Sequence, residues 1–201
     1  MKNLKKLLLL LFLFFVMHQK MSAQLLDSMQ LETTFAFTGL EEALKQPDQV
    51  IRLELRKMKL KAFPKEIFQF KNLQYLDISK NSIAYIPDSL FFLEKLQYLN
   101  TSKNKIEQIP PSIGKVQHLK WVNMNNNEIS AIPFTIGNLK ELIYLDLWSN
   151  NLSYFPESMN KLIALKTLDL RNIMLNAQQQ RRLRELMPNT IIHMDRACNC
   201  N

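Results

Sequence analysis

The sequence LQYLDISKN, from Leu73 to Asn81, decides the fold because it returns along the chain at a fixed interval. Three related stretches follow with a constant period of 23: LQYLNTSKN from Leu96, LKWVNMNNN from Leu119 and LIYLDLWSN from Leu142. Weaker copies extend the series by one step at each end, VIRLELRKM from Val50 and LKTLDLRNI from Leu165. A fixed period of this length is the signature of a stacked-repeat fold.

A second marker keeps the same period. Five prolines, each preceded by an apolar residue, recur at the same interval: Pro64, Pro87, Pro110, Pro133 and Pro156. Over residues 50–187 the chain resembles the leucine-rich repeat family, whose pattern is L-x-x-L-x-L-x-x-N-x-L/I. The Ile-Pro half of each unit is similar to the subgroup found in Ras-binding scaffold proteins and in many secreted bacterial proteins. We therefore expect about six repeats, starting at residues 50, 73, 96, 119, 142 and 165.

One repeat contains a short strand and a return path. Residues 75–79 alternate polar and apolar side chains, which predicts a strand with one buried face. Asn81 can hydrogen-bond the backbone of the bend after the strand, and its equivalents Asn104, Asn127 and Asn150 should form a ladder. Because proline withholds a donor, the Ile-Pro step favours an extended or short helical return. The predicted fold is an α/β solenoid, a horseshoe with a parallel concave β-sheet and a short helical or irregular convex side.

One buried column contains a polar exception. Thr101 stands where other repeats carry Ile78, Met124, Leu147 or Leu170. A buried hydroxyl needs a hydrogen-bond partner, and we expect a neighbouring backbone group to provide it.

Both ends of the repeat array show capping patterns. Residues 24–37 carry no firm pattern and are expected to form a loosely ordered arm, whereas Thr38 to Glu41 matches the S/T-x-x-E capping box of a short helix that Pro47 ends. These residues, 24–49, form the predicted N-terminal cap. At the other end, Ala177 to Leu186 has a helical pattern, and Thr190 to Met194 is predicted to pair with the last sheet edge. Residues 188–201 thus comprise a capping strand and a Cys-x-Cys tail.

The first part of the chain, residues 1–23, resembles a signal peptide. It combines three early lysines, an unbroken apolar run from Leu7 to Met17, and Met21-Ser22-Ala23 as a cleavage site. The run is shorter than the about 20 residues of a spanning helix, so no membrane span is expected after cleavage. We predict an exported, secreted, periplasmic or cell-surface protein.

Charge argues against a nucleic-acid partner. Residues 1–23 hold four lysines and no acid, so their removal lowers the formal net charge from +8 to +4. Basic residues gather near both ends of the array without the interleaved aromatic residues typical of nucleic-acid surfaces. These clusters are interpreted as solvated faces.

Residues for catalysis or a cofactor are sparse. Beyond residue 23 the chain has two histidines, His118 and His193, and two cysteines, Cys198 and Cys200. No Gly-rich phosphate loop or nucleophile elbow is present, and the Cys-x-Cys spacing fits none of the usual zinc frameworks. We therefore expect no enzyme activity, no cofactor and no metal. A disulfide between Cys198 and Cys200, a link to another chain and an unpaired tail all stay open.

The outward positions of the strands form the candidate site. Three columns are expected on the concave face, and the first is an aromatic stripe beside an acidic and amide stripe. The predicted partner-binding residues are Tyr75, Asp77, Tyr98, Asn100, Trp121, Asn123, Tyr144, Asp146 and Trp148. Trp and Tyr are enriched among interface hot spots, and the two tryptophans depart from the habit of the repeat.

These patterns predict a monomeric binding module for a protein or peptide. The same aromatic and acidic columns would also suit sugar rings, so glycan or cell-wall binding is the first alternative. A redox or metal role of the Cys-x-Cys tail and self-assembly into a surface component are the others.

Overall fold

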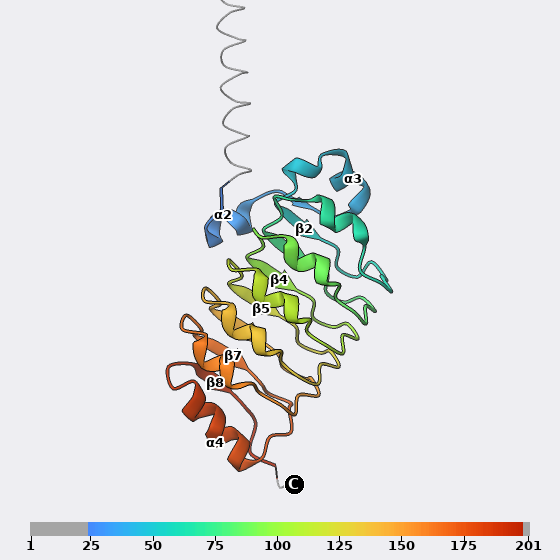
Figure 1. Ribbon diagram of the computed structural model, residues 1–201. Coiled ribbons are helices and arrows are strands. Elements are labelled where there is room, and N and C mark those ends of the chain that lie inside the picture. The colour runs from blue at the N-terminus through green and yellow to red at the C-terminus, as the bar shows by residue number, and fades with distance from the viewer. Residues whose placement is uncertain (1–23, 199–201) are drawn as a thin grey trace, which may run out of the picture.

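The computed structural model describes residues 24–198, which form one curved stack of coils (Figure 1). Eight short parallel strands pair in the order β1-β2-β3-β4-β5-β6-β7-β8. Their bounds are β1 Ala36–Phe37, β2 Arg52–Glu54, β3 Tyr75–Asp77, β4 Tyr98–Asn100, β5 Trp121–Asn123, β6 Tyr144–Asp146, β7 Thr167–Asp169 and β8 Ile191–His193. Strands β2 to β7 start at the same position of successive repeats, so the predicted solenoid is confirmed.

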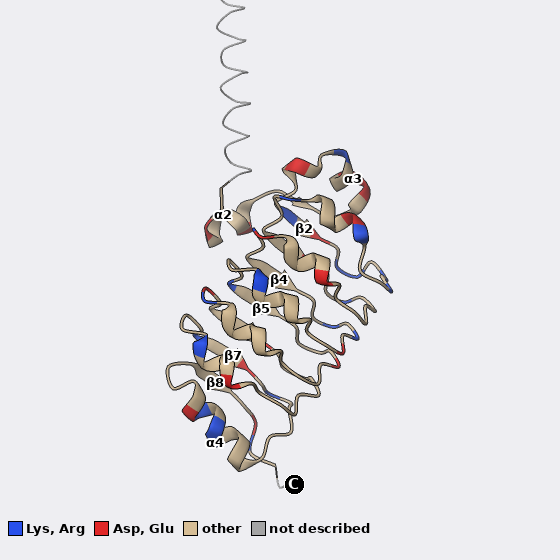
Figure 2. Cartoon of the chain, in the orientation of Figure 1, with Lys and Arg blue, Asp and Glu red and all other residues tan. Residues whose placement is uncertain are grey.

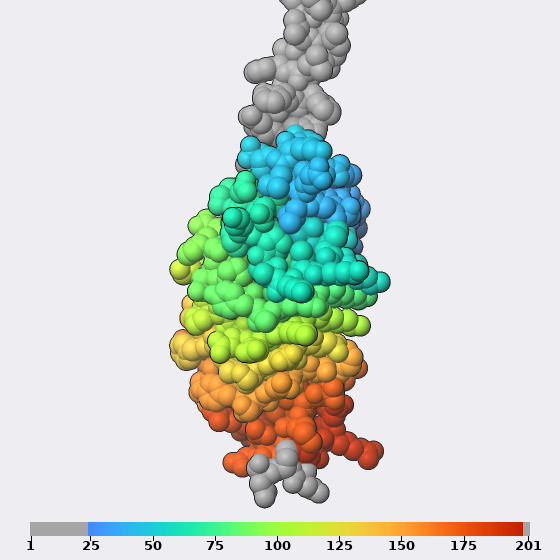
Figure 3. Space-filling view, turned by 90° about the vertical axis from the view of Figure 1, so that its right-hand side faces the viewer, coloured from blue at the N-terminus to red at the C-terminus, as the bar shows by residue number. Residues whose placement is uncertain are grey.

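The return paths are single 3₁₀ turns. Their bounds are η2 Lys65–Gln69, η3 Asp88–Phe92, η4 Pro111–Lys115, η5 Phe134–Asn138 and η6 Glu157–Lys161. Each begins directly after a proline of the repeated series, whose backbone is extended, as at Pro87 with φ −73° and ψ 145°. Because the coils stack at one spacing, the space-filling view shows them as successive bands in sequence order (Figure 3).

One continuous core runs through the stack. Leu76, Leu99 and their equivalents on the inner side of the strands have no exposed surface. The return paths add further buried columns, such as Ile86 and Leu90. A single coil could not bury this apolar surface alone, so the coils depend on their neighbours for stability.

The predicted asparagine ladder is confirmed. The side-chain amide of Asn127 donates to the carbonyl oxygens of Met124 in its own coil at 3.0 Å and Thr101 in the preceding coil at 3.1 Å. Its Oδ1 atom accepts from the backbone N–H of Ile106 at 3.0 Å. The same three bonds recur at Asn150. The ladder therefore satisfies the backbone of each turn and ties it to the preceding coil.

The C-terminal cap follows the prediction. Helix α4 spans Ala177–Leu186 and begins at Asn176, whose side chain accepts from the backbone N–H of Gln179. Strand β8 then pairs with β7 and closes that end of the sheet.

The N-terminal cap differs from the prediction. Residues 24–37 are ordered: helix α2 spans Ser28–Thr33, and strand β1 pairs with β2. The reason is a capping box between Asp27 and Gln30, each of which bonds the backbone N–H of the other. The box predicted at Thr38 is wrong, because helix α3, Leu40–Lys45, starts after Gly39 without a side-chain cap. A short 3₁₀ turn, η1 Pro47–Gln49, leads into β2.

The predicted signal peptide, residues 1–23, lies outside the described residues. Among residues 24–198, no helix is long and apolar enough to cross a bilayer.

The expected partner of Thr101 is absent. Its hydroxyl is fully buried and forms no hydrogen bond with any described residue. The prediction was wrong because the neighbouring carbonyls are already used by the sheet and the asparagine ladder. The backbone oxygen of Thr101 itself, for example, accepts from Asn104 and Asn127.

We expect Thr101→Val to stabilise the protein by about 1 kcal/mol, because the variant removes an unpaired buried hydroxyl at nearly constant volume. The measurement is urea-induced unfolding followed by circular dichroism. Thr101→Ser is the control, since it keeps the hydroxyl and loses a buried methyl group, and it should destabilise. A less stable valine variant would show that the hydroxyl does have a partner.

Candidate functional site

The concave face carries three columns of side chains in register. Strand pairing aligns Tyr75 with Tyr98, Tyr98 with Trp121, and Trp121 with Tyr144. Asp77, Asn100, Asn123 and Asp146 are aligned in the same way in the second column. The structure therefore brings together the aromatic and polar residues that the repeat predicted.

The aromatic column is made of two stacked pairs. The Tyr75 and Tyr98 rings are 4.0 Å apart and nearly parallel, at 2°. The Trp121 and Tyr144 rings are 4.7 Å apart at 26°. The guanidinium carbon of Arg52 lies 4.4 Å from the centre of the Tyr75 ring and extends the stack by a cation–π contact. Trp121 has 41% of its surface exposed, which makes it the most accessible ring of this column.

The second column has a structural role. Asp77 and Asp146 are buried, and each accepts the backbone N–H two residues later, from Ser79 at 2.9 Å and from Trp148 at 3.0 Å. Asn123 accepts the N–H of Asn125 in the same way. The side-chain oxygens expected to face a partner thus accept hydrogen bonds from the turn that ends the strand. Little of the acidic stripe is left for a ligand.

Two buried aspartates of this column, Asp146 and Asp169, have pKa values shifted in opposite directions. Burial raises the pKa of Asp146 above its usual value, although hydrogen bonds from Asn125 and Trp148 act in the opposite direction. Burial also acts to raise the pKa of Asp169, but hydrogen bonds from Arg171 outweigh it and hold that pKa below its usual value. Negative charge is therefore better stabilised at the C-terminal end of the column.

Helix α2 forms a wall that the repeat pattern did not predict. Leu26 and Leu31 pack with Ile51 in a small apolar cluster that covers one side of Tyr75 and Tyr98. Arg52 donates to the carbonyl oxygens of Leu31, at 3.2 Å, and Glu32. The N-terminal segment is thereby held against the first half of the aromatic column.

Two buried glutamines bind the backbone of this segment. Gln74 accepts from the N–H of Leu26 at 2.8 Å and donates to the carbonyl oxygen of Gln24 at 2.8 Å. Gln97 donates to the carbonyl oxygen of Leu26 at 2.9 Å and accepts from the Lys120 ammonium at 2.8 Å. Gln74, Gln97 and Lys120 occupy one position of three successive repeats, so they form a polar row beside the aromatic column.

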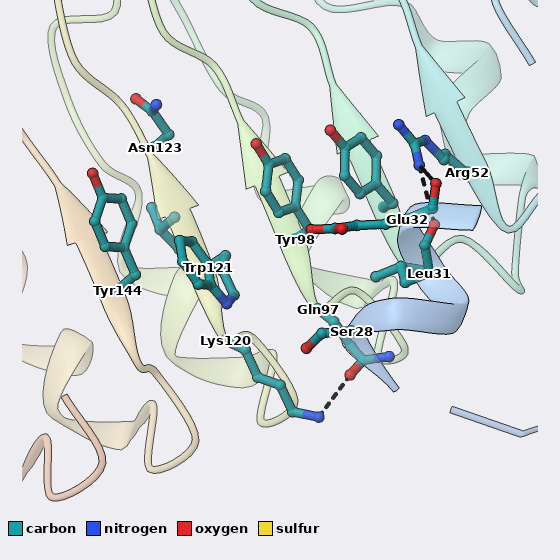
Figure 4. Close-up of a pocket in the computed structure, with 12 residues that line it drawn as sticks. Ser28, Leu31, Glu32, Arg52, Gln97, Tyr98, Lys120, Trp121, Asn123 and Tyr144 are labelled. Carbon is teal, nitrogen blue, oxygen red and sulfur yellow. Dashed lines mark hydrogen bonds between the residues drawn. The ribbon is translucent and has the colours of Figure 1, made fainter. Parts of the chain in front are cut away.

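Helix α2 and the aromatic column enclose a pocket of about 600 Å³ (Figure 4). Its aromatic floor comes from β3 to β6, and Leu31 closes one side. The lining residues are Ser28, Leu31, Glu32, Arg52, Tyr75, Gln97, Tyr98, Lys120, Trp121, Val122, Asn123 and Tyr144. Trp148, in the third column, is exposed but does not line the pocket. The arrangement offers an apolar, aromatic slot with a polar rim, which suits binding better than bond-breaking chemistry.

Sequence reasoning missed Leu31, Gln97 and Lys120 as parts of this site. The N-terminal wall had one available signal, the D-x-x-Q capping box from Asp27 to Gln30, which marks a helix start. Gln97 and Lys120 carry no such signal, because their role depends on where the N-terminal segment lies.

The C-terminal tail shows no metal site within the described chain. No group of three His, Cys, Asp or Glu side chains among residues 24–198 could hold a metal ion. Asp195 accepts the backbone N–H of Asn172 at 2.5 Å instead. Cys198 is disulfide-bonded, whereas Cys200 lies outside the described residues. His118 occupies a position at which the repeats carry different residues, and its Nδ1 atom lies 3.0 Å from Oε1 of Glu141.

Comparison with known families decides the relationship. A family model for the leucine-rich repeat region matches residues 90–196, and a leucine-rich repeat model matches residues 49–106. The chain belongs to the leucine-rich repeat family. A search of curated proteins found no match.

Solved leucine-rich repeat structures are similar. One from Leptospira interrogans is 34% identical, with a TM-score of 0.70 over 75% of this chain and 38% of that chain. The ectodomain of the Arabidopsis receptor kinase HAESA, in complex with a peptide hormone ligand, is 29% identical, with a TM-score of 0.63 over 80% of this chain and 28% of that one. An internalin from Listeria monocytogenes, 20% identical with a TM-score of 0.60 over 79% and 46%, shows the fold alone. The present chain spans less than half of the length of each of these three proteins.

We expect Gln97→Ala to release the N-terminal segment, because the carbonyl oxygen of Leu26 and the Lys120 ammonium both lose a partner. Limited proteolysis should then cut within residues 24–34 several times faster than in the parent protein. Gln108→Ala, at an exposed position, serves as the control. Equal cleavage of both variants would mean that the glutamine row does not hold α2.

Alkaline pH should destabilise the fold through the aromatic column. Burial raises the pKa of Tyr75, Tyr98 and Tyr144 above the ordinary value of about 10. A raised pKa favours the protonated form in the folded state, so its stabilisation is present below about pH 10 and is lost as pH rises toward the folded-state pKa.

Urea unfolding between about pH 9 and pH 11 should therefore show falling stability. Tyr75→Phe removes one of the three groups, so its stability should fall less steeply over the same interval. Identical slopes for the variant and the parent protein would contradict the raised pKa of Tyr75 in the folded state.

Proposed function

We propose that this chain is an exported, non-enzymatic binding module that holds a protein or peptide partner on its concave face. The pocket between α2 and the Trp121–Tyr144 pair is the proposed centre of contact. The observation that carries the proposal is the exposure of Trp121 in the floor of a preformed aromatic slot. Preformed apolar pockets with a few polar groups are typical ligand sites.

The N-terminal segment supports a polypeptide ligand. Residues 24–31 already lie on this face as a polypeptide would, with main-chain bonds to Gln74 and Gln97 and an apolar side chain, Leu31, against the aromatic column. Helix α2 covers the tyrosine pair and leaves the Trp121–Tyr144 pair accessible. A partner would meet this second pair with an apolar side chain of its own.

Two further observations support a peptide partner and export. The similar plant receptor structure is an ectodomain with a bound peptide hormone. The leader-like residues 1–23 of this chain provide a route for export.

The test is capture of partners by the immobilised chain, followed by affinity measurement with the captured protein. Trp121→Ala should weaken binding at least about tenfold, as expected for a central aromatic hot spot. Trp148→Ala tests whether the contact extends past the pocket.

Tyr85→Ala is the matched control, because Tyr85 is an exposed aromatic residue on a return path and should be neutral. If Trp121→Ala leaves the affinity for the partner unchanged, the concave face is not the binding surface. Glycan-array binding that depends on Trp121 would instead favour the carbohydrate alternative, since the stacked rings also suit sugar faces.

A further inference from the structure

A row of lysines occupies an unfavourable backbone position. The turns after strands β2 to β7 place one equivalent residue in the left-handed region with φ between 52° and 58°: Lys57, Lys80, Lys103, Asn126, Ser149 and Asn172. Lys59, in the first of these turns, has a φ of 57° as well. This conformation is costly for residues other than glycine, and asparagine tolerates it better than lysine does. The later repeats use asparagine or serine here, whereas the first three all use lysine.

These lysines also lie next to one another. Backbone hydrogen bonds join Lys57 to Ser79, Lys80 to Ser102 and Lys103 to Asn125, at 3.2, 2.9 and 2.9 Å. The three therefore stand in line on successive coils, about 4.8 Å apart at the backbone. Lys59 and Lys105 lie two residues further along the same turns.

Their charges have no local partner. All five lysines of this lysine strip are exposed, and none forms an ion pair with another residue of 24–198. Blue segments lie among the right-hand tips of the upper coils in Figure 2. Like charges on neighbouring coils repel each other, so the strip adds an electrostatic cost to the conformational one. No ion pair within residues 24–198 offsets the electrostatic cost.

The strip is narrow and ends abruptly. In the next coil, Asn126 and Glu128 replace Lys103 and Lys105, and exposed Glu107 lies two residues beyond Lys105. A flat anionic surface would meet these glutamates as well as the lysines. A linear anion that follows the strip would avoid them.

We propose that the lysine strip binds an acidic segment of a polypeptide, a run of aspartate and glutamate residues. Lys57, Lys80 and Lys103 directly follow residues of the third column of the concave face, so a polypeptide on that face would reach the strip over its rim. These third-column residues are Arg56, Ser79 and Ser102. In this respect the inference rests on the proposed function. The strip contains no aromatic side chain for stacking bases or sugars, and flexible ammonium groups suit carboxylates as point charges.

The test uses a fluorescein-labelled peptide of about twelve glutamates and fluorescence anisotropy at about 50 mM salt, where screening is weak. Replacing Lys57, Lys80 and Lys103 together by glutamine should weaken binding about tenfold, since each removes one close opposite charge. The control replaces the exposed lysines Lys65, Lys71 and Lys166 by glutamine, which changes the net charge equally. Binding of the control should change less than about twofold.

A second variant separates binding from folding. Lys57→Asn, Lys80→Asn and Lys103→Asn together should raise the midpoint of thermal unfolding, because asparagine relieves both the strain and the repulsion. The same variant should lose glutamate-peptide binding as the glutamine variant does.

Equal weakening by the strip and control variants would overturn the proposal, because net charge alone would then explain binding. Tighter binding of anionic lipid vesicles or single-stranded DNA than of the glutamate peptide would overturn the choice of ligand. Trp121→Ala should leave glutamate-peptide binding unchanged. The experiment therefore distinguishes failure of the lysine-strip proposal from failure of the proposed binding at the concave pocket.

Discussion

The hydrogen bonds from each ladder asparagine to its own turn and to the preceding coil are the constraint on which the structure depends. They satisfy backbone groups that would otherwise be buried without partners, and they hold the turns after β3 to β6 in one register. Because the turns coincide, equivalent residues of successive repeats fall opposite one another along the sheet. The aromatic column is a consequence of this register, since tyrosine or tryptophan at one repeat position must then meet its equivalent in the next coil.

The repeat explains which features the sequence could predict. Strand positions, the ladder and the C-terminal cap follow from local patterns that repeat or stop, so they could be read without knowing any long-range contact. The burial of Asp77 and Asp146 could not, because alternation places them outward while their carboxylates accept from the backbone N–H groups of the following turn. Helix α2 lies outside the repeat phase, and its docking depends on Gln74 and Gln97, which are distant in sequence.

The docking of α2 divides the aromatic column of the concave face into a covered part and an accessible part. Arg52, Tyr75 and Tyr98 are engaged by α2 through main-chain bonds and apolar packing. Trp121 and Tyr144 stack further along the same column, outside the apolar cluster that Leu31 forms, and Trp121 stays exposed. The chain thus covers part of its own aromatic surface, which lowers the exposed apolar area and limits where a partner can bind. Lys120 marks the boundary, since it bonds Gln97 on one side and lines the pocket on the other.

The two proposed contact regions would act on different parts of a binding reaction. Exposed lysines act over a distance near the Debye length, so a basic rim mainly speeds the approach of an acidic partner. Rings in a pocket act only after water has left, so the Trp121–Tyr144 pair would mainly slow dissociation. Both are presented on turns and strands fixed by the same asparagine ladder, and their separation is therefore set by the coil and not by flexible loops. A partner that used both would need an apolar side chain and an acidic run at one fixed spacing, which is a stricter requirement than either contact alone.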